Sequence, residues 1–191
     1  MRFTDISRDS VVGRAAGCIA AWDVTQGKGD GSYDPRGRVS RGQMASFLDR
    51  ALAAVGRRPP APSTTRFRDA RGTTHAAAIE RLAGAGLVAG RADGTYGPQD
   101  PVTRAQMATF LRRAYEHAAR RTLPEPAVPF SDVAGSPHTP AIAAVAGTGI
   151  AAGTGPGTYD PNANVTRAQM AQFLARWLDL AVTDGLATGP R

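Results

Sequence analysis

One block of sequence occurs three times in this chain of 191 residues, at a fixed period. The copies read Val-Ser-Arg-Gly-Gln-Met-Ala once and Val-Thr-Arg-Ala-Gln-Met-Ala twice. Their arginines, Arg41, Arg104 and Arg167, are separated by 104 − 41 = 63 and 167 − 104 = 63 residues. A fixed long period indicates one supersecondary unit that is built three times. A site on one unit should recur on the others, which favours a multivalent binding protein over an enzyme.

The repeat extends well beyond this block. Each unit opens with Phe-x-Asp and carries a Gly-rich loop with a tyrosine and a proline at matching positions. We expect repeats at residues 1–55, 67–118 and 130–181, proline-rich linkers at 56–66 and 119–129, and a flexible tail at 182–191. A unit of about fifty residues is marginal alone, so the three units should pool one core.

Both halves of each unit are predicted to be helical. In the second half Met107, Phe110, Leu111 and Ala114 follow the i, i+3, i+4, i+7 spacing of a buried helix face. The first half predicts a shorter helix that ends in a left-handed residue. We expect the loop tyrosine of each unit to pack over its own unit, with the hydroxyl at the surface. The fold class is therefore mainly α, with three helix–loop–helix repeats.

Each second helix begins with the signature of a capping box, a hydroxyl residue followed three positions later by glutamine. The pairs are Ser40 and Gln43, Thr103 and Gln106, and Thr166 and Gln169. Capping is a sufficient explanation for these residues, and they need no further function.

The repeated arginine is harder to explain, because it falls at the first helical position. The helix dipole places partial positive charge there, and a cation is mildly unfavourable. An anion bound by free N–H groups of the first turn and by the guanidinium would account for it. An internal ion pair with the Phe-x-Asp aspartate is the alternative, and simple exposure is a third. On the first hypothesis, replacing Arg104 and Arg167 together with alanine abolishes binding without unfolding the protein.

Composition excludes several classes. The net charge is +7, and Lys28 is the only lysine, so the charge reflects a preference for arginine as readily as a basic patch. The basic residues are spread without interleaved aromatics, so we expect no nucleic-acid binding. No apolar run is long enough for a membrane helix, and the first residues lack a signal-peptide core. Cys18 is the single cysteine and excludes an internal disulfide.

Catalytic and metal-binding patterns are also missing. The loop around Asp30 lacks the alternating oxygen ligands of a calcium site. The histidines His75, His117 and His138 do not recur in all three units. No nucleophile–base pattern, zinc spacing or nucleotide-binding loop is present. We therefore expect no enzyme activity, no metal and no cofactor.

The Phe-x-Asp opening, the Gly-x-x-x-Gly-x-Tyr-x-Pro loop and the Val-Thr-Arg-Ala-Gln block together resemble the S-layer homology (SLH) repeat, and three copies resemble a complete SLH module. The resemblance implies helical prongs in a pseudo-threefold spindle, whose inter-repeat grooves bind secondary cell-wall polysaccharide, often with an acidic ketal-pyruvate group. It therefore implies a non-catalytic cell-wall anchor at the cell surface, fused to or working with an exported protein. The alternative is a protein-interaction scaffold built from helical repeats.

The resemblance also implies which residues bind the ligand. They are Ser40, Arg41, Thr103, Arg104, Gln106, Thr166, Arg167, Gln169 and the opening acids Asp5, Asp69 and Asp132. Glutamine stands where the family usually has glutamate. Repeat one departs further, with Gly42 and Asp23 in place of the usual alanine and glycine. We therefore expect repeats two and three to supply the better binding positions.

Overall fold

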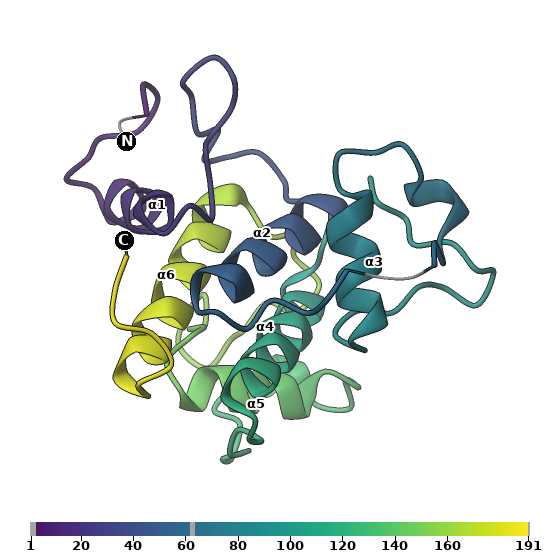
Figure 1. Ribbon diagram of the computed structural model, residues 1–191. Helices are drawn as coiled ribbons and strands as arrows, with labels where there is room; N and C mark the ends of the chain where they lie inside the picture. The colour runs from purple at the N-terminus through teal and green to yellow at the C-terminus, as the bar shows by residue number, and fades with distance from the viewer. Residues whose placement is uncertain (1–2, 62–63, 191) are drawn as a thin grey trace.

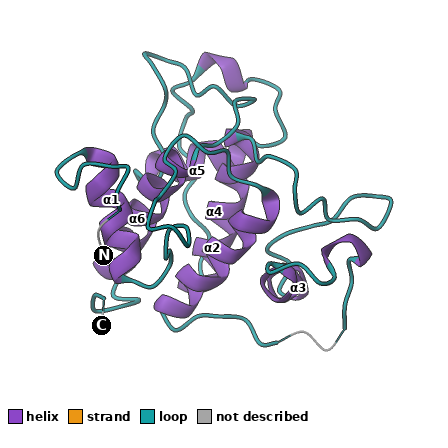
Figure 2. Ribbon diagram, turned by 90° about the horizontal axis from the view of Figure 1, so that it is seen from above, coloured by secondary structure: helices purple, strands orange, loops and turns teal. Residues whose placement is uncertain are grey.

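The computed structural model describes residues 3–61 and 64–190, and the described residues form six α-helices and two short 3₁₀ helices, with no strand (Figures 1 and 2). The remaining positions, 1–2, 62–63 and 191, fall in the expected first repeat, first linker and tail and lie outside the described residues. The mainly α fold predicted from the sequence is confirmed. Its helices are α1 (Val11–Ala21), α2 (Arg41–Ala54), α3 (Ala76–Gly84), α4 (Arg104–Ala119), α5 (Thr139–Gly147) and α6 (Arg167–Thr183), with 3₁₀ turns at Arg68–Ala70 and Ser131–Val133.

The three long helices α2, α4 and α6 form the centre, and each short helix packs against the long helix of a neighbouring repeat. Helix α3 packs on α2, α5 on α4, and α1 on α6 (Figure 1). The two halves of one repeat are therefore divided between two prongs. The pairing of α1 with α6 joins the first repeat to the third and closes the ring, which brings the two chain ends to the same side of the molecule.

Three valines mark the pseudo-threefold axis. The N–H of Val39 donates to the carbonyl of Val165 at 2.9 Å, that of Val102 to Val39 at 3.0 Å, and that of Val165 to Val102 at 2.9 Å. All three valines are fully buried. This closed cycle pairs one backbone N–H group and one carbonyl on every repeat. If a repeat left the ring, these backbone groups would lose their partners.

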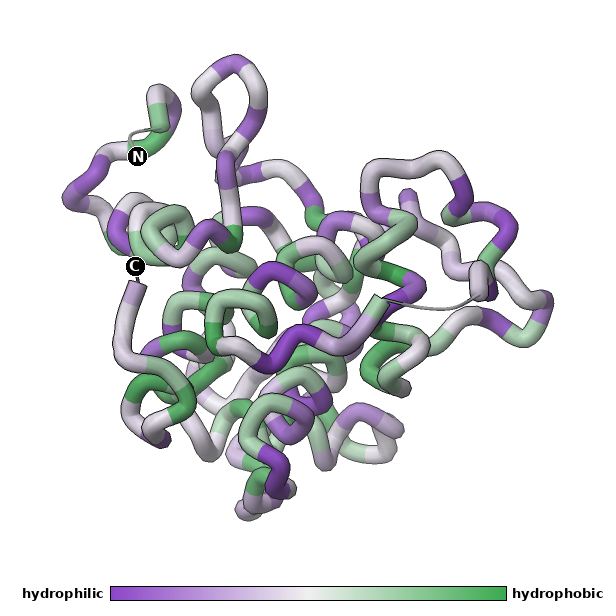
Figure 3. The backbone as a smooth tube through the Cα atoms, in the orientation of Figure 1, coloured by the Kyte–Doolittle hydropathy of each residue, from purple (hydrophilic) through white to green (hydrophobic). Residues whose placement is uncertain are grey.

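The predicted apolar stripe faces the core. Met107, Leu111 and Ala114 are fully buried, and Phe110 is nearly so, as are their counterparts in the other repeats. Figure 3 shows that the projecting loops are mostly pale or hydrophilic, whereas the hydrophobic residues gather along the packed helices. The first helices end as expected, because Asp23, Gly86 and Gly149 have φ values of 57°, 72° and 75°. Within the described residues no helix has the length and apolarity needed to span a membrane.

Candidate functional site

The capping boxes predicted at the starts of α2, α4 and α6 are all formed. In α4 the backbone N–H of Gln106 donates to the Thr103 hydroxyl at 3.3 Å, and the N–H of Thr103 donates to Gln106 Oε1 at 3.1 Å. The same reciprocal pair joins Ser40 to Gln43, and Thr166 to Gln169. These side chains therefore accept hydrogen bonds from backbone N–H groups at the helix start.

The two remaining first-turn N–H groups of each long helix are also occupied. The N–H groups of Arg104 and Ala105 donate to the carbonyls of Ala163 and Pro161 at 2.9 and 3.0 Å. Equivalent bonds tie Arg41 and Gly42 to the loop of repeat two, and Arg167 and Ala168 to the loop of repeat one. The helix starts therefore offer no free N–H groups to an anion, and a ligand can meet side chains only.

Each repeated arginine reaches into the next repeat. Arg104 Nε donates to the Tyr159 carbonyl at 2.7 Å, and its Nη2 donates to the Ala152 carbonyl at 2.9 Å. The guanidinium lies 4.5 Å from the centre of the Tyr159 ring, a cation–π contact. Arg104 is 2% exposed, and burial lowers its pKa. An arginine in this position joins two repeats.

The same contact recurs around the ring. Arg41 donates to the carbonyls of Tyr96 and Ala89, and Arg167 donates to the Tyr33 carbonyl at 2.6 Å. The tyrosines are buried, contrary to the surface hydroxyls expected from the sequence, and each hydroxyl donates to the carbonyl of the arginine that covers its ring. Burial raises the pKa of Tyr33, Tyr96 and Tyr159 to about 12.

The aspartates of the Phe-x-Asp elements hold loops within their own repeats. Asp69 accepts from the N–H groups of Tyr96 and Gly97 at 2.9 and 2.8 Å, and Asp5 and Asp132 do the same in the other repeats. Burial alone would raise the pKa of Asp5 and Asp69, but the N–H donors outweigh it and lower both, and they also lower the pKa of Asp132. The aspartates thus form hydrogen bonds with backbone instead of the proposed ion pair with arginine.

Three equivalent grooves lie between neighbouring repeats, and each is defined by one long helix, the start of the adjoining short helix and one repeated arginine. The first groove lies between α2 and α3 and includes Arg167, the second lies between α4 and α5 and includes Arg41, and the third lies between α6 and α1 and includes Arg104. The first groove holds a cavity of about 240 Å³.

Cationic and polar side chains line this cavity. Arg167, Arg50, Lys28 and His75 contribute from three repeats, beside the capping residue Gln43. Arg167 is 6% exposed, and its Nη2 is buried with no hydrogen-bond partner. A buried donor without an acceptor is costly, so this nitrogen is suited to donate a hydrogen bond to an oxygen of a ligand.

A histidine forms one wall of the first and second grooves. His75 Nδ1 lies 2.8 Å from the Ser46 hydroxyl, and His138 Nδ1 lies 2.8 Å from the Thr109 hydroxyl. Burial lowers the pKa of His75, and the nearby Arg50 lowers it further; burial and Arg113 act in the same way on His138. Both imidazoles are therefore neutral at pH 7, and the arginines supply the charge.

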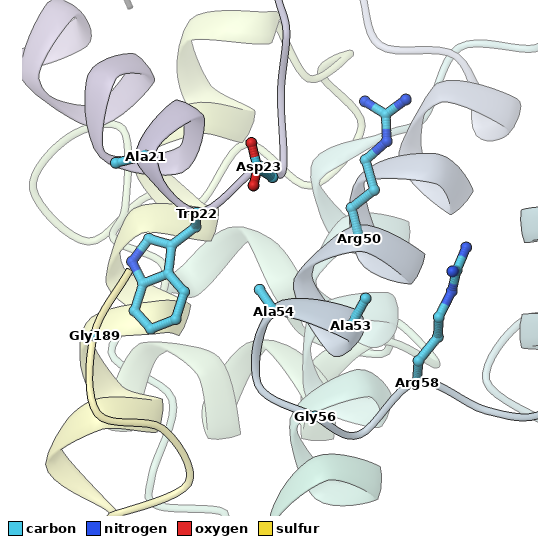
Figure 4. A pocket seen from close by; sticks show the side chains of 9 residues that line it. All are labelled: Ala21, Trp22, Asp23, Arg50, Ala53, Ala54, Gly56, Arg58 and Gly189. Atoms are coloured by element: carbon cyan, nitrogen blue, oxygen red, sulfur yellow. The ribbon is translucent and has the colours of Figure 1, made fainter. Parts of the chain in front are cut away.

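A second cavity, of about 320 Å³, adjoins the first and shares Arg50 with it. Figure 4 shows Trp22 and Asp23 at the end of α1 facing the last turn of α2, with Arg50 and Arg58 on the opposite side and the backbone at Gly189 beside the indole. Trp22 is 9% exposed, so only part of its indole could meet a ligand.

A second set of repeated arginines was not among the predicted site residues. Arg50, Arg113 and Arg176 recur at the same period as the first arginine of each helix, 113 − 50 = 63 and 176 − 113 = 63, and this regularity was a signal available in the sequence. Lys28 and Arg91 also share a position, which Thr154 occupies in repeat three. The described residues contain no cluster of three or more His, Cys, Asp or Glu side chains arranged to hold a metal ion.

The chain is similar in sequence to known proteins. The chain is 32% identical over 153 residues to an uncharacterized cell wall amidase of Bacillus anthracis, which covers 78% of this chain and 27% of that protein. It is 30% identical over 151 residues to an S-layer protein of Bacillus licheniformis, covering 78% and 16%. A cell surface protein of Thermoanaerobacter kivui is 35% identical over 120 residues, covering 61% and 16%. The chain spans about a quarter or less of the length of these relatives.

The family profile described as S-layer homology domain matches three tandem segments, residues 2–45, 66–108 and 129–171. These segments together make up more than half of the chain and contain the three copies of the arginine block. The chain belongs to the S-layer homology domain family.

Proposed function

We propose that this chain is a non-catalytic module that attaches a protein to the cell wall by binding an acidic wall polysaccharide in its inter-repeat grooves. The observation that carries the proposal is the unpartnered Nη2 of Arg167, buried in a cavity that also contains Arg50 and Lys28. Membership of the SLH family and likeness to S-layer and cell surface proteins support it.

The chemistry of the cavity fits a carboxylate carried on a sugar. A guanidinium presents its N–H groups in a plane that matches a carboxylate, and such charge-assisted bonds are about twice as strong as neutral ones. Gln43 and the neutral His75 add groups that can meet sugar hydroxyls. A pyruvylated sugar would present its carboxylate to Arg167 and Arg50 and its hydroxyls to the remaining wall.

We propose a smaller set of ligand-contacting residues than the sequence suggested. Arg167, and Arg41 in the equivalent groove, are proposed to contact ligand, because both line cavities. Gln106 lines a cavity of the second groove and is proposed to do the same. Arg104 and the aspartates Asp5, Asp69 and Asp132 are proposed to shape the grooves from within, since their polar groups already bond to backbone. Ser40, Thr103, Thr166 and Gln169 hold the helix starts that position the arginines.

Attachment is proposed as the whole contribution of this chain, with any catalysis supplied by other parts of a larger protein. One relative is named an amidase, but the chain covers only 27% of it. The polysaccharide and not a nucleic acid or a membrane is the proposed partner, because Arg167 and Arg50 line one cavity together with neutral groups that can meet sugar hydroxyls. The expected location is the cell surface.

Co-sedimentation with purified cell walls of the producing organism tests this function, before and after acid extraction of the secondary polysaccharide. We expect the chain to pellet with native walls and to stay in the supernatant with extracted walls. Binding that survives extraction would instead identify peptidoglycan or a wall protein as the partner and would contradict the proposal. Absence of binding to both preparations would also contradict it.

A further inference from the structure

The three grooves differ at one backbone hydrogen bond. In the second groove Arg41 Nη2 donates to the carbonyl of Ala89 at 2.9 Å, and in the third Arg104 Nη2 donates to the carbonyl of Ala152 at 2.9 Å. The equivalent carbonyl in the first groove belongs to Gln26, because 26 + 63 = 89 and 89 + 63 = 152. Arg167 Nη2 makes no such bond and is left without a partner. The arginine Nη2 therefore has a backbone partner in two grooves and has none in the first.

The backbone beside this carbonyl explains the difference. Gly27 has a φ of 73°, whereas its counterparts Gly90 and Gly153 are not among the residues with positive φ. Because the peptide unit is planar, a change of φ at residue 27 turns the whole peptide between residues 26 and 27, including the carbonyl. Glycine tolerates this conformation without strain. The turned peptide leaves Gln26 without its bond to the guanidinium.

Thr25 is the side chain that holds the turned peptide. Its hydroxyl accepts a hydrogen bond from the N–H of Gly27 at 3.3 Å, and the residue is 3% exposed. The equivalent residues of the other repeats are Val88 and Ala151, which have no hydroxyl and cannot make this bond. The difference between the grooves thus follows from a difference in sequence at one buried position.

The charges of the grooves differ in the same direction. The cavity of the first groove is lined by Arg167, Arg50 and Lys28 and by no carboxylate. Lys28 is paired with Asp34, which lies outside that lining, so Arg167 and Arg50 supply most of the charge of this cavity. The cavity of the second groove, of about 230 Å³, is lined by Arg41 and Arg91 but also by Asp100, which is paired with Arg91. A carboxylate in that position repels an acidic ligand and competes for the cation.

The third groove lacks the loop cation that the other two have. Thr154 stands where the other loops have Lys28 and Arg91, and Val12 stands at the position of His75. Its arginine, Arg104, is 2% exposed, and its Nε and Nη2 both donate to backbone carbonyls. Arg176 is the counterpart of Arg50 in this groove, because 50 + 126 = 176.

We propose that the first groove is the principal site for the acidic group of the ligand, and that Thr25 keeps Arg167 available by holding the peptide at Gly27 away from it. This inference rests on the proposed glycan binding. The three grooves are then unequal, and one chain has one strong site. The first repeat, which the sequence had marked as the weaker contributor, supplies most of that site.

Titration calorimetry with the polysaccharide released from walls of the producing organism by acid extraction tests the inequality. The variants Arg50→Ala, Arg113→Ala and Arg176→Ala remove equivalent arginines from the first, second and third grooves. We expect Arg50→Ala to weaken binding by about tenfold, the loss typical of a charge-assisted contact, and the other two by less than about threefold. The wild type should show one strong site per chain.

The role of Thr25 is tested with Thr25→Val, which copies the residue of repeat two and nearly preserves volume. We expect about fivefold weaker binding or more, and a crystal structure of the variant should show Arg167 Nη2 bonded to the carbonyl of residue 26, as in the other grooves. Val88→Thr on repeat two is the matched control for a threonine at this position. Thermal unfolding confirms that each variant is folded.

The outcomes separate the two proposals. Failure of the wild type to bind the released polysaccharide overturns the proposed function, and the inference with it. Binding by the wild type that falls equally in the three arginine variants leaves the function standing and overturns the inequality. A Thr25→Val protein that binds like the wild type, with Arg167 Nη2 still unpartnered in its structure, overturns the role of Thr25.

Discussion

Arg104 and Tyr159 hold each other by two hydrogen bonds that run in opposite directions. The guanidinium Nε donates to the Tyr159 carbonyl at 2.7 Å, and the Tyr159 hydroxyl donates to the Arg104 carbonyl at 3.3 Å, while the cation lies over the ring. The pair joins the second repeat to the third, and its copies join the others. The arginine of the SLH block thus joins neighbouring repeats, in addition to being a candidate ligand-binding residue.

Replacing Arg104 with alanine should destabilise the protein. The substitution removes two charge-assisted hydrogen bonds and two cation–π contacts, with Tyr159 and Phe173, and it leaves two carbonyls unpaired. We therefore expect a loss of about 3 kcal/mol in the free energy of unfolding. Urea unfolding followed by circular dichroism measures it. Arg113→Ala on the same helix, at an exposed position, should change stability by less than about 0.5 kcal/mol.

The double substitution of Arg104 and Arg167 with alanine should also destabilise the protein. The sequence suggested that it would abolish wall binding without unfolding the chain. Because both side chains are buried between repeats, we expect the double variant to lose stability as well as binding. A double variant as stable as the wild type would show that the contacts between repeats are dispensable.

Removing the hydroxyl that caps α4 should have a smaller effect. Thr103→Ala deletes the acceptor for the N–H of Gln106, and we expect a loss of about 1 kcal/mol. Thr103→Ser keeps the hydroxyl, as Ser40 does in repeat one, and should recover most of the loss. Thermal unfolding of the three proteins checks this order, and equal stability of the alanine and serine variants would contradict the capping role.

Two glycines on α1 predict opposite effects of the same substitution. A Cβ on Gly13 would lie 2.0 Å from the carbonyl oxygen of Ser7, so Gly13→Ala must displace backbone and should destabilise the protein. A Cβ on Gly17 meets nothing within 4 Å, so Gly17→Ala should stabilise the helix by about 0.5–1 kcal/mol. Denaturant unfolding of both variants tests the packing of the N-terminal segment on α1.

Acid should weaken the fold through two half-buried histidines. The pKa values of His75 and His138 are lowered in the folded protein by burial and by Arg50 and Arg113. The unfolded chain therefore binds protons at a higher pH than the folded chain, and stability falls as pH drops below about 6.5. Unfolding at pH 8, 6.5 and 5 measures the slope.

The matched control for the pH effect is the double variant His75→Asn and His138→Asn, which removes both titrating groups. Its stability should change less between pH 7 and pH 5 than that of the wild type. The aspartates with lowered pKa values, Asp5, Asp69 and Asp132, contribute stability above their unfolded value near 3.8 and lose it at lower pH, outside this window. An unchanged slope in the double variant would rule out the histidines as the cause.

The sequence alone determined what is local in this protein. The helix at Met107 and Phe110 and its capping by Thr103 depend on residues three and four positions apart, so periodicity and capping rules suffice to predict them. The number of repeats follows from the 63-residue period, and the family was suggested by the resemblance of the Phe-x-Asp opening, the Gly-rich loop and the arginine block.

The tertiary structure decided where the repeated arginine goes and which groove is left with a free donor. Arg104 meets Tyr159 at a separation of 55 residues, and Arg167 meets Tyr33 at 134 residues, so no local rule connects them. Packing of each short helix on a neighbouring repeat makes these contacts possible, and the closure of the ring places Thr25 beside Arg167. A hydrogen bond between distant repeats exists only once the ring has closed. The hydrogen-bond partners of the arginines therefore could not be predicted from the sequence.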